Sequence, residues 1–385
     1  MCAYLPREIW ECILLKLSIK NLVLCTSVSK DWKSLITNPS FISNHIDHTI
    51  KANDGNQHLL LRLWRLTVDG SKESFSLRLD CEQLDLLSKL EYPLNDQSHA
   101  TYSQVVGTCN GLVCIYNLFM GFIIWNPSIR KYMVLPEPII DTHNGDFVKC
   151  FGFGFNSKNN DFKVIRLMSH QLDKPSIPEV EVCSLATRCW KIKSLISGKA
   201  PLFILKRLPF ARTNRMFMNG LLHWVVMRRG FNNENFIMTF DLVEETFGEM
   251  MMPESLREKD SAVSVLGGAD LLTVIHSFSP PSFHSSNFEE YFNVWVMKEY
   301  GIVESWTKVY TGITKSLSRP LGFRKSTGDV LLHCNSSEEI IAVNEENIQS
   351  AGKKLRIKGH GDASLSYYVE SLFLLDQDTD DVISY

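Results

Sequence analysis

The feature that most constrains the fold is a change in hydrophobic spacing near residue 50. Before it, apolar residues recur every three or four positions, as on one face of a helix; after it, they form short runs separated by turn residues. No long helical periodicity returns in the second part. The pattern predicts a small all-α module at residues 1–50, a linker at 51–60 and a large all-β domain at 61–385.

The helical module begins at the segment LPREIWECILLKL. Pro6 suits a first helical turn and Glu8 is favoured by the helix dipole. Ser18 and Ser29 are at positions where they can cap two further helices. Pro39 ends the third of these, because a residue before proline is driven out of the helical region, and a short fourth helix is expected to follow.

Three of these segments, LPREIWECILLKL, VSKDW and NPSF, resemble the F-box. The resemblance implies docking on the Skp-type adaptor of an SCF ubiquitin ligase, and through it on cullin and RING subunits. Ser18 departs from the pattern, since plant relatives commonly have proline there. The alternative is an apolar stripe that packs only on the second domain. The adaptor-binding positions implied are Leu5, Pro6, Ile9, Ile13, Leu14 and Leu17, with Val28 and Trp32 partly core and partly interface.

The β domain contains a recurring unit of two apolar strands, a polar turn, an aromatic residue and a further strand. Units begin near Asn110, Phe151, Asn219, Gly267 and Gly322, on the scale of about 40 to 50 residues that propeller blades need. One longer step contains an insertion at 197–214. In three of these units, two large or buried-type residues occur seven positions apart in the sequence: Trp125 and Tyr132, Cys183 and Trp190, and Phe240 and Phe247.

A leading strand pair within residues 58–80 and a closing strand at 367–376 are expected to share one blade, which removes open sheet edges. The predicted fold is therefore a kelch-like β-propeller of about six blades, with an irregular β-sandwich array as the alternative. Segments such as YSQVVGTCNGLVCIYN and VWVMKEYGIVESWTKVY are also similar to the F-box-associated domain, and especially to the S-locus F-box proteins. That resemblance implies a substrate receptor whose target is a secreted pistil S-ribonuclease.

Charge and composition exclude several classes of protein. With 40 Lys+Arg against 43 Asp+Glu, the chain lacks the basic footprint that captures nucleic acid or anionic lipid. An uncharged stretch between Gln97 and Ile129 imitates a membrane span, but Gly and Asn residues divide it into strand-length pieces. Arg7 and two glutamates interrupt any signal sequence, so ten reduced cysteines and a cytoplasmic location are expected, with the nucleus left open.

No catalytic, metal or cofactor motif stands out, and the chain is interpreted as a non-catalytic protein. Cys109 and Cys114 are too far apart for a C-x-x-C pair and fit buried thiols better. His45 and His48 lack an accompanying metal motif, and Gly152 and Gly154 lack the helix of a dinucleotide loop. These glycines are expected to ease close strand packing.

Recognition loops are expected at 141–149, 171–179, 228–235 and 277–289, because propeller loops vary while the blades hold position. Acidic residues there would steer a basic ribonuclease, and Arg228 and Arg229 would oppose it. Ordinary solvated loops, a receptor for another protein, a propeller that binds a small ligand, and an adaptor-binding protein that delivers no target remain alternatives. The acidic candidates are Asp141, Asp146, Glu179, Glu234, Glu289 and Glu290.

Overall fold

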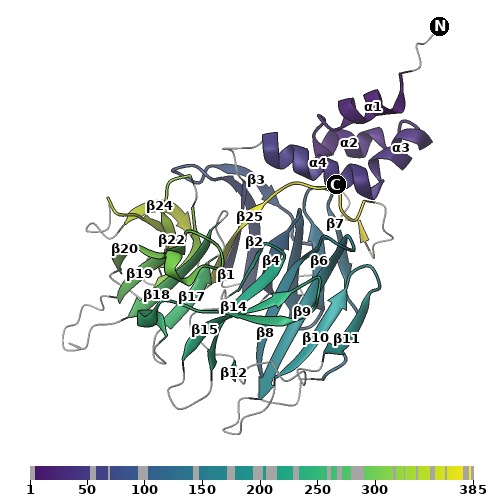
Figure 1. The fold of residues 1–385 in the computed structure, drawn as a ribbon. Helices are drawn as coiled ribbons and strands as arrows, with labels where there is room; N and C mark the ends of the chain where they lie inside the picture. The colour runs from purple at the N-terminus through teal and green to yellow at the C-terminus, as the bar shows by residue number, and fades with distance from the viewer. Residues whose placement is uncertain are drawn as a thin grey trace.

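The computed structural model of the chain consists of four short helices at one end of a ring of β-sheets (Figure 1). The residues that it describes are 5–52, 58–67, 70–93, 103–141, 147–170, 178–193, 203–204, 215–228, 234–257, 262–266, 271–278, 290–314, 318–324, 326–334, 337–346, 352–359, 362–375 and 381–382.

The helices are α1 (Arg7–Leu14), α2 (Ile19–Cys25), α3 (Lys30–Ile36) and α4 (Pro39–Ala52). Ser29 caps α3, since its side chain accepts a hydrogen bond from the Trp32 amide at 3.1 Å. Ser18 occupies the corresponding position before α2 but makes no such side-chain bond. α4 runs to Ala52 and the first strand begins at His58, so both elements extend into the range expected for the linker.

The described strands form six twisted sheets, which we number as blades I to VI. Blade I contains β4 (Ser103–Cys109), β5 (Leu112–Asn117), β6 (Gly121–Asn126), β7 (Lys131–Val134) and β26 (Asp381–Val382). Blade II contains β8 (Phe147–Asn156), β9 (Asp161–His170), β10 (Glu179–Ser184) and β11 (Cys189–Lys193). Blade III contains β12 (Phe203–Ile204), β13 (Arg215–Met218), β14 (Leu221–Arg228), β15 (Asn235–Asp241) and β16 (Phe247–Met250).

Blade IV contains β17 (Ala262–Leu266), β18 (Leu272–Phe278), β19 (Glu290–Met297) and β20 (Trp306–Thr314). Blade V contains β21 (Ser318–Phe323), β22 (Val330–Cys334), β23 (Glu339–Val343) and β24 (Lys353–Lys358). Blade VI contains β25 (Asp362–Tyr368), β1 (His58–Thr67), β2 (Gly70–Leu79) and β3 (Leu86–Leu90). Two 3-10 turns, at Glu254–Leu256 and Val303–Ser305, complete the described elements.

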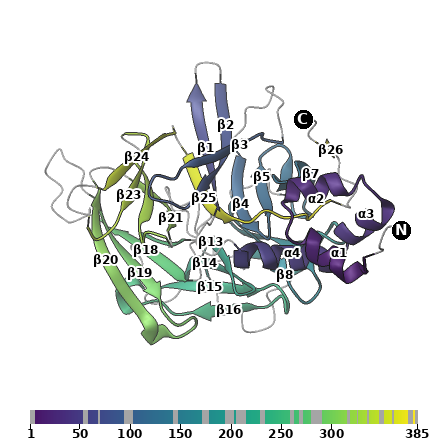
Figure 2. The same ribbon diagram turned by 90° about the horizontal axis from the view of Figure 1, so that it is seen from above.

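The predicted six-bladed propeller is confirmed. Each blade's innermost strand packs against the next, from β25 through β4, β8, β13, β17 and β21 back to β25, so the ring closes (Figure 2). Blade VI joins the two ends of the domain, because β1 pairs with β25. The expected closing strand was placed too late in the sequence: the strand is Asp362–Tyr368, and residues 369–375 leave the sheet.

The three pairs separated by seven residues lie directly opposite one another on neighbouring strands. Trp125 faces Tyr132, Cys183 faces Trp190 and Phe240 faces Phe247. Such pairs stabilise antiparallel sheets through side-chain contact. A Cβ on Gly152 would come within 2.7 Å of the Leu222 and Trp224 side chains, which confirms that glycine here permits close packing between blades II and III.

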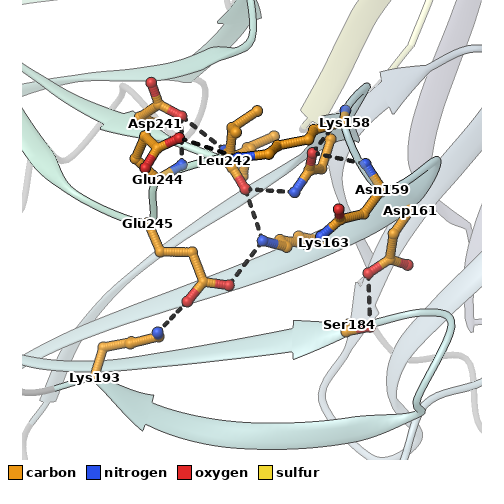
Figure 3. A network of polar contacts seen from close by, with 12 residues as sticks. Lys158, Asn159, Asp161, Lys163, Ser184, Lys193, Asp241, Leu242, Glu244 and Glu245 are labelled. Carbon is orange, nitrogen blue, oxygen red and sulfur yellow. Dashed lines mark hydrogen bonds and ion pairs between the residues drawn. The ribbon is translucent and has the colours of Figure 1, made fainter.

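A buried polar cluster joins blades II and III beside the β15–β16 turn (Figure 3). Lys163 Nζ donates to the Leu242 carbonyl and pairs with the Glu245 carboxylate, both at 2.7 Å. Asn156 Nδ2 donates to the same carbonyl at 3.0 Å, and Lys193 also pairs with Glu245. A lysine that is almost fully buried needs such partners, so the cluster fixes the two blades relative to each other.

The F-box helices and the propeller share one continuous hydrophobic cluster. Leu22 and Phe41 of the helices belong to the same cluster as Leu112 of blade I and Leu372 of the segment 369–375. Asn126 Nδ2 holds that segment through the carbonyl oxygens of Ser371 and Phe373, at 3.0 and 2.8 Å. The helical module is therefore seated on blade I by the C-terminal segment (Figures 1 and 2).

Candidate interaction surfaces

Helix α1 presents one apolar face to solvent and one to the molecule. Leu5 before it, and Ile9 and Ile13 within it, are exposed, with Ile9 45 % exposed. Leu14 is only 1 % exposed and belongs to the core shared with the propeller. Among the predicted adaptor-binding positions, Leu14 is therefore in the core, because the next residue along a helix lies about 100° further around its axis.

The other predicted adaptor-binding positions divide in the same way. Pro6 and Val28 are exposed, whereas Leu17 and Trp32 are half-buried. The Trp32 ring packs on Trp10 at a centroid distance of 5.1 Å, and the Leu17 carbonyl accepts a hydrogen bond from His45 Nε2 at 3.0 Å. Leu24 on α2 is exposed as well.

Helix α1 is the helix of the module that lies furthest from the propeller (Figure 1). An apolar side chain exposed singly on a protein surface needs no explanation, but a contiguous group indicates an interaction site. We call Leu5, Pro6, Ile9, Ile13, Leu24 and Val28 the outer face of the F-box.

The predicted recognition loops start and finish at the end of the propeller opposite the F-box, which we call the far end. Strand β1 is the next described element after α4, so it starts at the F-box end and finishes at the far end. Because the strands of each blade are antiparallel, every second connection between strands lies at the far end. Asp141, Glu179 and Glu234 are exposed there. Glu290 is the first residue of β19, and its side chain, like all of Asp146, Arg229 and Glu289, lies outside the described residues.

The Arg228 side chain makes its contacts within its own blade, blade III. Its guanidinium pairs with Glu249 and lies over the Phe236 ring at 5.1 Å from the centroid. Because both contacts use the cation, its opposition to a basic partner is smaller than its charge alone indicates.

One exposed apolar segment at the far end was missed by the sequence interpretation. The turn between β5 and β6 presents Leu118, Phe119 and Met120, and Phe119 is 66 % exposed. The signal was available, since three consecutive apolar residues lie between the turn-forming Asn117 and Gly121. A run of this kind at a turn is unfavourable unless another molecule covers it.

The described residues contain no group of three or more His, Cys, Asp or Glu side chains that could hold a metal ion. Nine cysteines within that part of the chain are free thiols, and Cys109 and Cys114 are buried as expected. His223 and His333 are buried as well. None of the described helices is long and apolar enough to cross a membrane.

The chain is a two-part protein, in which a helical module with an exposed apolar face is seated on a six-bladed propeller. Residues 4–44 match the F-box domain family, and residues 67–374 match the family described as "F-box associated beta propeller domain". The chain therefore belongs to the F-box proteins that carry an F-box-associated β-propeller domain.

Relatives in Arabidopsis thaliana agree with this assignment. F-box protein CPR1 is 32 % identical over 87 % of this chain and 81 % of its own length. F-box protein At4g22390 is 29 % identical over 87 % of this chain and 82 % of its own length. Among solved structures, TolB from Acinetobacter baumannii is 12 % identical and matches 85 % of this chain and 72 % of its own with a TM-score of 0.41.

Proposed function

We propose that this protein is the substrate-recognition subunit of an SCF-type ubiquitin ligase, with the F-box bound to a Skp-type adaptor and the propeller bound to a target protein. The observation that carries the proposal is the outer face of the F-box. Leu5, Ile9 and Ile13 remain exposed although the same helices contribute Leu14 and Leu22 to the shared core. An adaptor helix or loop covering this face would remove the apolar surface from water.

In this role the chain performs no chemistry of its own. The adaptor, with its cullin and RING subunits, would bring a conjugating enzyme to a target held by the propeller, and proximity would raise the effective concentration of target lysines. The shared core between helices and blade I supports this role, because a fixed orientation keeps the target at a constant distance from the adaptor.

Replacing Leu5 and Pro6 together by Ala tests the adaptor part. Adaptor capture from solution should be lost, while the circular dichroism spectrum and the melting temperature of the propeller stay unchanged. Ile50→Ala is the matched control, because Ile50 is also an exposed apolar residue but lies on α4 outside the outer face. Undiminished adaptor binding by the Leu5/Pro6 variant would contradict the proposed adaptor-binding role of the outer face.

A finer proposal is that the target is a pistil S-ribonuclease, as the resemblance to S-locus F-box proteins implies. The exposed carboxylates of Asp141, Glu179 and Glu234 at the far end favour a basic protein of this kind. Co-purification with a panel of pistil ribonucleases should yield at least one specific partner. Binding of none, together with ubiquitination of an unrelated protein, would leave a receptor for a different target.

A further inference from the structure

The turn Leu118–Met120 is held in one conformation. Asn117 Oδ1 accepts hydrogen bonds from the Phe119 and Met120 amides at 2.9 and 3.1 Å, and Asn117 Nδ2 donates to Ser103 Oγ at 3.0 Å. Gly121 completes the turn with a φ of +73°, which a side chain would disfavour. Because the backbone is already ordered, binding there costs little conformational entropy.

A second exposed segment, residues 135–141, lies next to this turn. The Leu135 amide donates to the Phe122 carbonyl at 2.8 Å, which places the start of the segment beside the end of the turn. Trp190 Nε1 donates to the Pro136 carbonyl at 2.7 Å. The segment therefore bridges blades I and II at the far end, and its Ile139 is 57 % exposed.

A buried ion pair between Arg166 and Glu181 binds the backbone of the same segment. Glu181 Oε1 accepts a hydrogen bond from the Ile140 amide at 2.8 Å, and Arg166 donates to the Ile140 carbonyl at 2.8 Å. The two side chains also pair with each other at 2.6 Å, and Glu181 is 0 % exposed. Burying such a pair is costly, so its bonds to both polar groups of Ile140 indicate that the position of this segment is closely specified.

One more apolar side chain continues the surface on blade II. Ile192 is exposed and lies directly opposite Glu181 on the neighbouring strand, so both side chains are on the same side of the sheet. Lys193 is on the other side of β11, where it pairs with Glu245. We call Leu118, Phe119, Met120, Ile139 and Ile192 the Phe119 patch.

The charged residues of the two segments that form most of the Phe119 patch are acidic, although Lys149 lies near Asp141 and Lys191 is exposed beside Ile192. Residues 117–121 and 135–141 contain no Lys or Arg, whereas Glu137 and Asp141 are exposed on the second segment. Glu179 is exposed at the start of β10 in the adjoining blade. A complementary partner would therefore present apolar side chains beside cationic ones.

We propose that the Phe119 patch binds target proteins, through a segment in which large apolar residues are adjacent to lysine or arginine. This inference rests on the proposed function, and it specifies the chemistry of the target and the part of the propeller that contacts it. Phe119 and Ile139 are the expected anchors, because large apolar side chains on a rigid support contribute most to such interfaces. The β5–β6 turn and segment 135–141 lie at the far end of the propeller, so a target and an adaptor can be bound at the same time.

The test uses the full chain in complex with its Skp-type adaptor and a phage-displayed library of random 12-residue peptides. Enriched peptides should combine apolar residues with Lys or Arg. Their affinity, measured by fluorescence polarisation, should fall at least ten-fold in the double variant Phe119→Ser and Met120→Ser. It should fall several-fold in Glu137→Lys, and fall more steeply with added salt in the unmodified protein than in Glu137→Lys.

Ile302→Ser is the matched control, since Ile302 is also an exposed apolar residue but lies in the β19–β20 turn at the F-box end. It should bind the peptides as the unmodified protein does. Unchanged affinity in the Phe119/Met120 variant, enrichment of acidic peptides, or a dimer that this variant dissociates in light-scattering measurements would each overturn the proposal. Adaptor binding by the same complexes is measured separately, so failure here is distinguishable from failure of the ligase assignment.

Discussion

Neighbouring residues of α1 have opposite surroundings, whereas consecutive residues of β6 are all covered. Ile13 is exposed and Leu14 is buried, but Phe122, Ile123, Ile124 and Trp125 are each at most 1 % exposed. A propeller strand is covered on both sides because blades pack on both faces of its sheet. The F-box has the propeller on one side only. The comparison shows that β6 is covered entirely by other parts of the chain, while one apolar face of α1 is left exposed.

The largest effect on stability is expected from breaking a charge pair inside the propeller. Glu181→Ala leaves Arg166 buried without its carboxylate and should lower the free energy of unfolding by about 3 to 5 kcal/mol. Urea unfolding measures the change. The paired replacement Arg166→Met with Glu181→Leu should restore much of the loss. If Glu181→Ala were as stable as the unmodified protein, the ion pair in blade II would be less shielded from water than the side chains of β6.

The two faces of α1 can be separated by adjacent substitutions. Leu14→Ala should lower the free energy of unfolding by about 2 to 5 kcal/mol, because it leaves a cavity in the shared core. Ile13→Ala should change stability by less than about 0.5 kcal/mol and weaken adaptor binding instead. Urea unfolding and adaptor titration distinguish the two outcomes. If Leu14→Ala and Ile13→Ala lowered the free energy of unfolding equally, the distinction between the exposed and the buried face of α1 would be wrong.

A pH effect is expected in the propeller at the junction of blades III and IV. Burial lowers the pKa of His223 to about 4, although its hydrogen bond to the Met216 carbonyl opposes the shift. Nδ1 donates to that carbonyl at 3.2 Å, which leaves Nε2 to accept from the Tyr300 hydroxyl at 2.6 Å. A protonated ring would lose the second bond.

The unfolded chain therefore binds more protons than the folded one between pH 6.5 and about 4. Stability from His223 is fully present above pH 6.5 and decreases as pH falls through that window, by at most about 3 kcal/mol. Urea midpoints measured from pH 7 to pH 4 should show the decrease. The slope should be smaller in His223→Gln, and an unchanged slope in that variant would assign the effect to other groups.

The smallest effect concerns helix caps in the F-box. Ser29→Ala should cost about 1 kcal/mol, because it removes the hydrogen bond to the Trp32 amide. Ser18→Ala is its matched control and should cost much less, since the Ser18 side chain makes no cap bond. Thermal unfolding of both variants gives the comparison, and equal costs would contradict the difference between the two caps.

Much of the architecture was predictable from local spacing. The period of three to four residues identified the helices, and the pairs separated by seven residues proved to be cross-strand neighbours, such as Trp125 and Tyr132. The closing strand was placed too late because residues 367–376 are as apolar as a strand, although most of them pack against the F-box and blade I. An apolar run predicts that its side chains are buried, but it does not predict which part of the molecule packs against them.

The sequence by itself determined the two-part organisation, the propeller and the segments of the F-box, because these depend on the order of apolar and turn residues along the chain. Only the tertiary structure decided which apolar residues stay uncovered. Leu14 and Ile13 carry the same local signal, yet Leu14 is 1 % exposed and Ile13 is 42 % exposed. Exposure depends on which blade or helix packs alongside, and residues far apart in sequence provide that packing.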